Sequence, residues 1–344
     1  MNFDLDQEHL DLAEGAREFL AAAASSPAAA RAALDEGTTS AGGSGNAARP
    51  APAQPAVRPG RAELVKSGFA TITVPESAGG GGGSVLQLAV VAEQAGRVLA
   101  GPSLVSFARS AALLAGDPDR LAGLADGSLA VAVVDDGGPV LDAIGADTFL
   151  ARRGGALVCG PGTVTAREPI DPTRGLGDVT LGETVVLAPD AAELWQRGER
   201  VGRTILAAEG LGAAARLLEM GVDYAKQRPA FGRLIGSYQA VKHLLVDVYV
   251  EVEQLRSLVW WAAWAADRAP AELPLAAAAA KAAAATTLEH AAEAVIQVHG
   301  GIGFTWEHDA HLYWRRAKVD RFLLGDDVAA FDEVARLAME AATR

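Results

Sequence analysis

Two short blocks in the C-terminal half carry residue types that suit a phosphate-bearing cofactor. The later block reads Gln297-Val-His-Gly-Gly-Ile-Gly303 and follows a long Ala-rich helical pattern. Gly300 and Gly301 allow a helix to end in a sharp turn, and they leave backbone N–H groups open to a phosphate or ribose. A plain helix end followed by a loop would show the same glycines, so the turn alone does not decide between the two interpretations.

The earlier block contains an arginine beside a glycine turn, between two helical patterns. It reads Tyr224-Ala-Lys-Gln-Arg228-Pro-Ala-Phe231-Gly232, and Gln239 stands near the start of the next helix. A planar cation, open N–H groups and a helix dipole suit a pyrophosphate. Phe231 either lies against an aromatic ring system or fills the core.

Bulk composition excludes several classes of protein. The chain has 344 residues and a formal net charge of −13, which argues against a nucleic-acid binder. The single cysteine, Cys159, excludes an internal disulfide framework and a cysteine-only zinc site, and a reducing cytoplasm fits. The N-terminus has no secretory signal pattern, and the Ala-rich run 276–280 ends at Lys281, too short for a membrane span.

No metal site is expected. The spacing His308-x-x-His311 suits one helix face, but no third ligand is evident in the sequence.

The order of patterns predicts an α+β chain that is mainly helical, in three domains. The first, 1–127, has helical patterns over 6–24, 61–67 and 86–99, with an Ala-, Pro-, Gly- and Ser-rich mobile loop over about 25–60. The second, 128–190, is a small β-domain with strand patterns over 129–134, 148–152, 156–159, 162–166 and 184–188. The third, 191–344, is a helical bundle with helices over 205–227, 239–266, 276–298, 308–319 and 327–342.

Taken together, the blocks resemble the acyl-CoA dehydrogenase family. The family patterns are Tyr-Ala-x-x-Arg-x-x-Phe-Gly with a later Gln-Ala, and Gln-x-His-Gly-Gly-x-Gly-Phe. Near the N-terminus the chain resembles the family in Phe3-Asp-Leu-Asp-Gln-Glu-His-Leu, in Val74-Pro-Glu76 and in Glu93-Gln-Ala-Gly-Arg97. The resemblance is close over 203–321, fair over 61–102 and poor over 128–190. The variant Gly-Phe-Thr-Trp-Glu-His-Asp-Ala-His looks most like the short subunit of actinobacterial heteromeric, steroid-type members.

The resemblance implies a fold, a cofactor and a reaction. The fold is an N-terminal helical domain, a middle β-domain and a C-terminal four-helix bundle, with FAD shared across a dimer interface. Arg228, Phe231 and Gly232 would hold the pyrophosphate side of the neighbouring subunit's FAD, and Gln239 is a weaker candidate. Gln297, Gly300 and Gly301 would serve the adenosine side. The substrate would be an acyl-CoA thioester, dehydrogenated across Cα–Cβ, with an electron-transferring flavoprotein as acceptor.

The chain departs from the family where a catalytic base is needed. The two positions that carry the family's glutamate align with Gly202 and Leu324, and neither accepts a proton. Asp326 and Glu209 are weak candidates for a displaced base, and Asp326 also suits the cap of the helix at 327–342. The loop that holds the flavin ring in the family is replaced by 133–140, which reads Val-Val-Asp-Asp-Gly-Gly-Pro-Val.

Three hypotheses therefore stand. The chain is the base-lacking subunit of a heteromeric acyl-CoA dehydrogenase and completes a partner's FAD site. Alternatively, it is a self-sufficient homotetramer with a displaced base. The third alternative is a non-catalytic scaffold that uses the bundle only for association.

Overall fold

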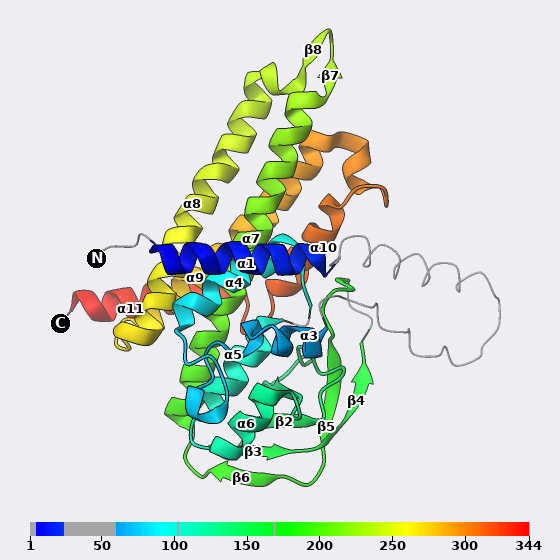
Figure 1. Ribbon diagram of the computed structural model, residues 1–344. Coiled ribbons are helices and arrows are strands. Elements are labelled where there is room, and N and C mark those ends of the chain that lie inside the picture. The colour runs from blue at the N-terminus through cyan, green and yellow to red at the C-terminus, as the bar shows by residue number, and fades with distance from the viewer. Residues whose placement is uncertain (1–4, 24–59, 102, 168–169, 344) are drawn as a thin grey trace, which may run out of the picture.

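A computed structural model describes residues 5–23, 60–101, 103–167 and 170–343. The N-terminal part is helical, as predicted (Figure 1). Its helices are α1 (Gln7–Ala22), α3 (Arg61–Lys66), α4 (Val85–Arg97), α5 (Leu104–Leu113) and α6 (Pro118–Asp126), with 3-10 turns at Phe69–Thr71 and Glu76–Ala78. The predicted mobile loop over about 25–60 lies outside the described residues, except for Gly60, the N-cap of α3.

Side-chain caps define where these helices begin. The Asp6 carboxylate accepts a hydrogen bond from the His9 backbone N–H at the start of α1. At α4, Ser84 and Gln87 form a reciprocal capping box. Helices α5 and α6 were not predicted from the sequence, although Ser103 and Asp117 cap them in the same way.

The middle part contains a four-stranded sheet in the order β1-β2-β3-β6 and a separate two-stranded sheet, β4-β5. The strands are β1 (Val131–Val134), β2 (Thr148–Arg153), β3 (Ala156–Gly160), β4 (Gly162–Ala166), β5 (Gly177–Leu181) and β6 (Val185–Ala188). β1 and β2 are parallel, with Val131 opposite Thr148, whereas the other pairs are antiparallel. Five of these strands match the predicted patterns within two residues, and β5 is additional.

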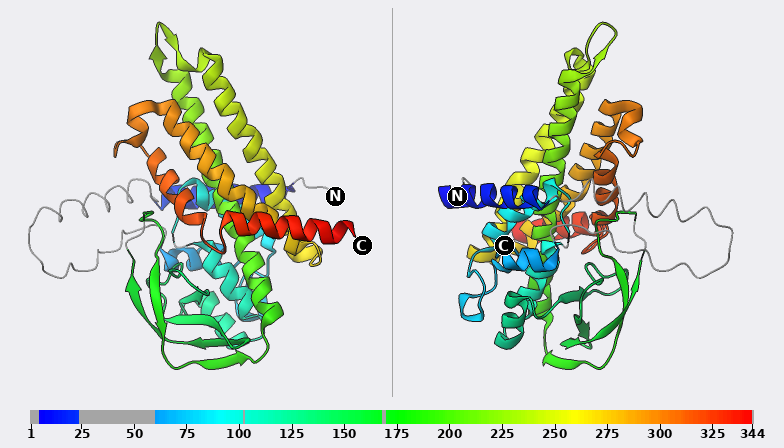
Figure 2. Two further views of the ribbon diagram at one scale, coloured as in Figure 1. Left: turned by 180° about the vertical axis from the view of Figure 1, so that it is seen from behind. Right: turned by 45° about the vertical axis from the view of Figure 1, so that its right-hand side comes forward.

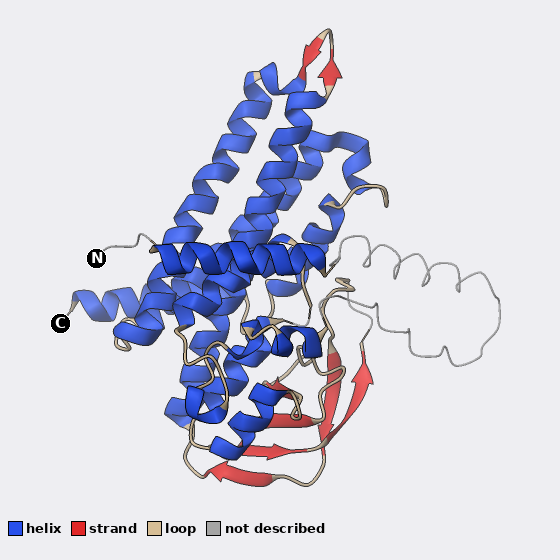
Figure 3. Ribbon diagram, in the orientation of Figure 1, coloured by secondary structure: helices blue, strands red, loops and turns tan. Residues whose placement is uncertain are grey.

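The C-terminal part is a helical bundle (Figure 3). It comprises α7 (Ala192–Gln227), α8 (Gln239–Arg268), α9 (Leu273–His299), α10 (Ala310–Asp320) and α11 (Asp327–Ala342), with a 3-10 turn at Gly300–Phe304. A short hairpin, β7 (Pro229–Ala230) and β8 (Arg233–Leu234), joins α7 to α8. α7 begins 13 residues before the predicted helix at 205, and it packs on both α4 and α5.

Backbone contact between α4 and α7 ties the N-terminal helices to the bundle. A Cβ on Gly96 would lie 1.8 Å from the Glu209 carbonyl oxygen, and one on Gly212 would lie 1.7 Å from the Glu93 carbonyl oxygen. Only glycine permits this approach, because any side chain would collide with the opposing backbone. The crossing fixes the middle of α7, including Glu209, against the N-terminal helices.

The hairpin and the β-sheets lie at opposite ends of the molecule. The long helices α7 and α8 carry β7–β8 beyond one end of the bundle, while β1–β6 gather at the other end (Figures 1 and 2). The domain boundaries at 127/128 and 190/191 stay predictions. Within the described ranges, none of the helices is both long enough and apolar enough to cross a bilayer.

Candidate functional site

The structure brings the two sequence blocks together at the hairpin end of the bundle. The Tyr224 ring, near the end of α7, stacks on the His299 ring at the end of α9, with 4.2 Å between ring centroids. His299 in turn lies 4.0 Å from the His308 ring. Ala225 and Val298 share a small apolar cluster beneath these rings. The ends of α7 and α9 are thus in contact, and the glycine turns that follow them, at Gly232 and at Gly300–Gly301, are exposed to solvent.

All seven residues predicted to bind the cofactor are exposed. They are Arg228, Phe231, Gly232, Gln239, Gln297, Gly300 and Gly301. The Phe231 side chain is 97% exposed, so it fills no part of this chain's core. A Cβ on Gly232, Gly300 or Gly301 would meet no atom within 4 Å. The open glycine turns and the exposed guanidinium fit a phosphate-bearing group held from outside the chain.

The tip of the hairpin has an unusual backbone. Phe231 has φ +50° and Gly232 has φ +79°. A bulky residue in the left-handed region carries a conformational cost, and such residues concentrate at functional sites. The strained backbone holds an aromatic ring in solvent at the end of a rigid helical arm.

The two base positions of the family meet at a different place, beside a cavity of about 810 Å³ near the β-sheets. Leu324 lines this cavity. A Cβ on Gly202 would lie 3.0 Å from the Leu324 Cδ1 atom. The positions aligned from sequence are therefore neighbours in space, although 122 residues separate them.

The turn that carries Leu324 is held firmly against α7 and α9. The Arg203 Nε donates to the Leu324 carbonyl oxygen at 3.0 Å. The Lys281 Nζ donates to the carbonyl oxygens of Asp320 and Arg321 at 3.1 and 3.0 Å, and burial lowers the pKa of this amine to about 8. Leu324 itself has φ +60°. The turn is constrained, yet the side chain it presents has no basic atom.

Three carboxylates line the cavity, and each forms an ion pair with an arginine. Asp135 binds Arg109 through both oxygens at 2.6 and 2.7 Å. Asp136 lies 2.9 Å from Arg152. Glu199, on the first turns of α7, lies 2.7 Å from Arg203. Sequence reasoning noted the loop with the two aspartates but found neither arginine partner, because these contacts connect separate elements.

Neither candidate for a displaced base lines the cavity. Asp326 is exposed and accepts a hydrogen bond from the Ala329 N–H, so it caps α11 as the capping interpretation predicted. Glu209 is 2% exposed, and both of its oxygens are bonded. Its Oε1 accepts from the Ser103 hydroxyl and the Leu104 N–H, and its Oε2 pairs with Arg174 at 2.8 Å.

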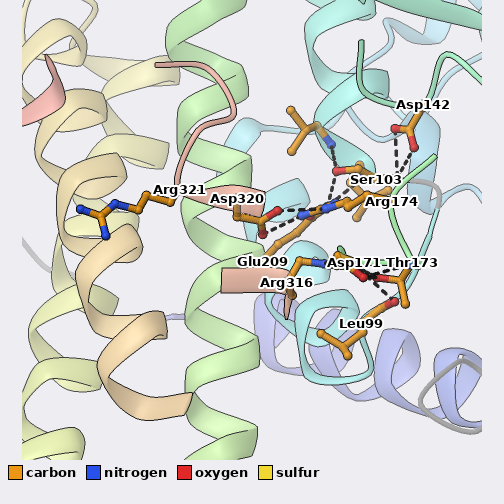
Figure 4. A network of polar contacts seen from close by, with 12 residues as sticks. Leu99, Ser103, Asp142, Asp171, Thr173, Arg174, Glu209, Arg316, Asp320 and Arg321 are labelled. Atoms are coloured by element: carbon orange, nitrogen blue, oxygen red, sulfur yellow. Dashed lines mark hydrogen bonds and ion pairs between the residues drawn. The ribbon is translucent and has the colours of Figure 1, made fainter. Parts of the chain in front are cut away.

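Glu209 belongs to a buried polar network that joins the β-region to the bundle (Figure 4). The Arg174 guanidinium bridges Glu209 of α7 and Asp320 of α10. Arg316, also on α10, pairs with Asp171 at 2.6 Å and donates to the Thr173 hydroxyl. Sequence reasoning missed this network, since its bonded partners lie up to 146 residues apart, as in the pair Arg174 and Asp320.

The described residues contain no group of three histidine, cysteine, aspartate or glutamate side chains placed to hold a metal ion. His311, the second member of the pair singled out in the sequence, lies edge-on to the Trp306 ring at 5.0 Å.

Comparisons with known proteins agree with this architecture. Residues 6–117 match the model of the acyl-CoA dehydrogenase N-terminal domain, and residues 195–339 match that of the C-terminal domain. Acyl-CoA dehydrogenase IpdE2 of Mycobacterium tuberculosis is 40% identical over 257 residues, which cover 73% of this chain and 77% of the relative. IpdE2 of Mycolicibacterium smegmatis is 36% identical over 261 residues, which cover 75% and 80%.

Solved structures with the same fold include two whose names give a pair of proteins. The Tcur3481-Tcur3483 steroid acyl-CoA dehydrogenase variant is 25% identical, with a TM-score of 0.82 over 98% of this chain and 99% of that one. The ChsE4-ChsE5 complex of Mycobacterium tuberculosis is 25% identical, with a TM-score of 0.78 over both full chains. The mainly helical fold and the family resemblance predicted from sequence are thus confirmed. The chain belongs to the acyl-CoA dehydrogenase family of oxidoreductases, for which FAD is the cofactor.

Proposed function

We propose that this chain is the base-lacking subunit of a heteromeric acyl-CoA dehydrogenase, in which it completes the FAD site of a partner subunit. The observation that carries the proposal is that the residues suited to FAD and the two base positions lie in different parts of the molecule. The residues suited to an FAD tail are exposed at the hairpin end of the bundle, while the two base positions, beside the cavity near the β-sheets, hold glycine and leucine.

The hairpin end supports a role in a neighbour's cofactor site. Arg228 offers a planar cation for the pyrophosphate, and Gly232 leaves room for its close approach. Gln297, Gly300 and Gly301 are the residues proposed for the adenosine side, with Gln239 as a further contact. When bound, FAD supplies the acceptor for the hydride that leaves the Cβ of an acyl thioester. This chain's contribution would be to bind and orient that cofactor.

The residues around the cavity support the lack of a base. Removal of the α-proton needs a basic atom within about 3 Å of it. Leu324 and Gly202 have none, and the three lining carboxylates are committed to Arg109, Arg152 and Arg203.

The relatives favour a heteromer. Two structures at 25% identity are named as pairs, Tcur3481-Tcur3483 and ChsE4-ChsE5, and the first is named as a steroid acyl-CoA dehydrogenase. By analogy with these two structures, we propose that the partner is a second acyl-CoA dehydrogenase chain. The substrate would be a steroid-derived acyl-CoA. An electron-transferring flavoprotein as acceptor and a cytoplasmic location belong to the same proposal.

The alternatives have less support. A homotetramer with a displaced base would need Glu209 or Asp326 beside the substrate, and neither lines the cavity. A scaffold without a cofactor would have no use for an exposed arginine and three open glycines gathered at one end of the bundle.

The test is the FAD content of the chain alone and with its partner. The chain would be purified alone and co-purified with a dehydrogenase encoded nearby, and flavin would be measured by absorbance after denaturation. We expect little FAD in the chain alone, about one FAD per pair in the complex, and loss of that FAD with Arg228→Ala. The matched control is Arg336→Ala, which removes another exposed arginine, on α11. Stoichiometric FAD and acyl-CoA oxidation by the chain alone would refute the proposal.

A further inference from the structure

An arginine fills the space in which a base at position 202 would stand. A Cβ on Gly202 would lie 2.6 Å from the Arg109 Cδ and 2.7 Å from its Cγ. Arg109 comes from α5 and is 4% exposed. At this point of the cavity wall the charged group is therefore a guanidinium and not a carboxylate.

The Arg109 guanidinium already forms a bidentate ion pair with the carboxylate of Asp135. Arg109 Nη1 and Nη2 donate to the two Asp135 oxygens at 2.7 and 2.6 Å. Asp135 sits just after β1, and its side chain is 42% exposed. Gly137 and Gly138 follow, with φ near +85° and no atom within 4 Å of either Cβ position. The loop is open on this side, and Asp135 is a half-exposed carboxylate bound to a buried arginine.

Beside the charged side chains of Asp136, Arg152, Glu199 and Lys318, the cavity has a broad apolar wall. Its walls include Val105, Val133, Leu141, Trp195, Phe322 and Leu323. Its volume of about 810 Å³ falls within the range of pockets that enclose small organic ligands. The Arg109 guanidinium carbon also lies 5.9 Å from the centre of the Trp195 ring, which holds the cation at the wall.

We propose that this cavity binds a free apolar carboxylic acid, whose carboxylate replaces Asp135 on Arg109. The apolar body of the ligand would fill the space beside Trp195 and Leu141. This function goes beyond completion of a partner's FAD site, because it assigns a ligand to the cavity of this subunit. When no ligand is bound, Asp135 occupies Arg109 and acts as an internal competitor. The apparent affinity of the cavity for the ligand is therefore reduced in proportion to the fraction of Arg109 that Asp135 occupies.

The competitor makes the proposal testable by a gain in affinity. The probe is decanoate, titrated into the full chain by calorimetry, with decanol and decanoyl-CoA as comparisons. Asp135→Asn removes the competing charge while Arg109 is kept, so decanoate should bind about tenfold tighter or more. Arg109→Gln should abolish binding, and decanol should bind at least about tenfold more weakly than decanoate because it cannot form the paired bonds.

The matched control is Asp178→Asn, which removes the same charge from an exposed ion pair with Arg167, outside the cavity. Its affinity for decanoate should equal that of the parent. The proposal would be overturned if Asp135→Asn bound decanoate no more tightly than this control. It would also be overturned if decanol bound as tightly as decanoate, or if the chain bound decanoyl-CoA but did not bind decanoate. The readout is ligand binding and not FAD content, so failure here leaves the heteromer proposal to its own test.

Discussion

Two residues, Gly202 and Leu324, decide what this chain can do at its own cavity. Arg203 and Lys281 hold the turn that presents Leu324. The stem of Arg109 occupies the space that a side chain at position 202 would need. Both positions are thus closely packed, and neither of them holds a proton-accepting side chain. A base restored at position 202 would have to displace the stem of an arginine that Asp135 holds in place.

The close packing at Gly202 predicts a loss of stability for Gly202→Ala. The new Cβ would meet the Arg109 stem at 2.6 Å, and we expect a cost of about 1–3 kcal/mol in the free energy of unfolding. Gly210→Ala, two turns later in α7, is the control, since its nearest neighbour, the Ala284 Cβ, lies 3.5 Å away. That variant should be neutral or more stable by up to about 1 kcal/mol. Urea denaturation measures both, and equal effects would contradict the packing argument.

Buried Lys281 predicts a rise in stability with pH. Burial lowers the pKa of its amine from 10.5 to about 8, so between these values the unfolded chain binds more protons than the folded chain. The free energy of unfolding therefore rises with pH in that window, and below pH 8 this contribution is constant. From pH 8 to 10 the parent should gain about 2 kcal/mol relative to Lys281→Met.

Denaturation at a series of pH values gives this difference directly. Cys159 and Tyr313, whose pKa values burial raises, titrate in both proteins, so their effects cancel in the comparison. The exposed Lys226→Met is the control and should follow the parent. Parallel profiles for the parent and Lys281→Met would show that the buried amine does not carry the pH dependence.

At the scale of elements, the β7–β8 hairpin is where a substitution should change cofactor binding without changing the stability of the chain. Phe231 is 97% exposed and has a positive φ, so Phe231→Ala should change the free energy of unfolding by less than about 0.5 kcal/mol. The same change should lower the FAD content of the complex with a partner subunit. Met339→Ala, at a side chain that is 71% exposed on α11, should change neither quantity. A large loss of stability in Phe231→Ala would show that the hairpin packs within this chain.

Element prediction from sequence succeeded where periodicity and caps were clear. Helix α11 begins and ends as predicted, and α8 and α9 match within three residues. Helix α5 was missed because nine of its ten residues are buried, including Arg109, so no polar face marks it. Strand β5 was missed because Gly177 and Asp178 open it, two residues with low strand propensity. The cofactor motifs were readable because each is local, whereas Arg109 meets Asp135 across 26 residues and from another element.

At the scale of the whole molecule, one buried network links the β-region to the bundle. Arg174, between β4 and β5, reaches Glu209 on α7 and Asp320 on α10, and Arg316 reaches back to Asp171 (Figure 4). The same α10 ends in the turn that bears Leu324. The network thus fixes the cavity wall relative to the strands, which is a requirement for any ligand held between them.

Loss of the central cation should therefore destabilise the whole chain. Arg174→Met leaves the carboxylates of Glu209 and Asp320 buried without their shared partner, and we expect a cost of about 3–5 kcal/mol. Arg167→Met removes a neighbouring arginine whose ion pair with Asp178 is exposed, and it should cost less than about 1 kcal/mol. Urea denaturation followed by both tryptophan fluorescence and circular dichroism distinguishes two outcomes. A single transition at lower urea would show that the network supports one cooperative unit, whereas an unchanged midpoint would mean that the strands and the bundle hold together without it.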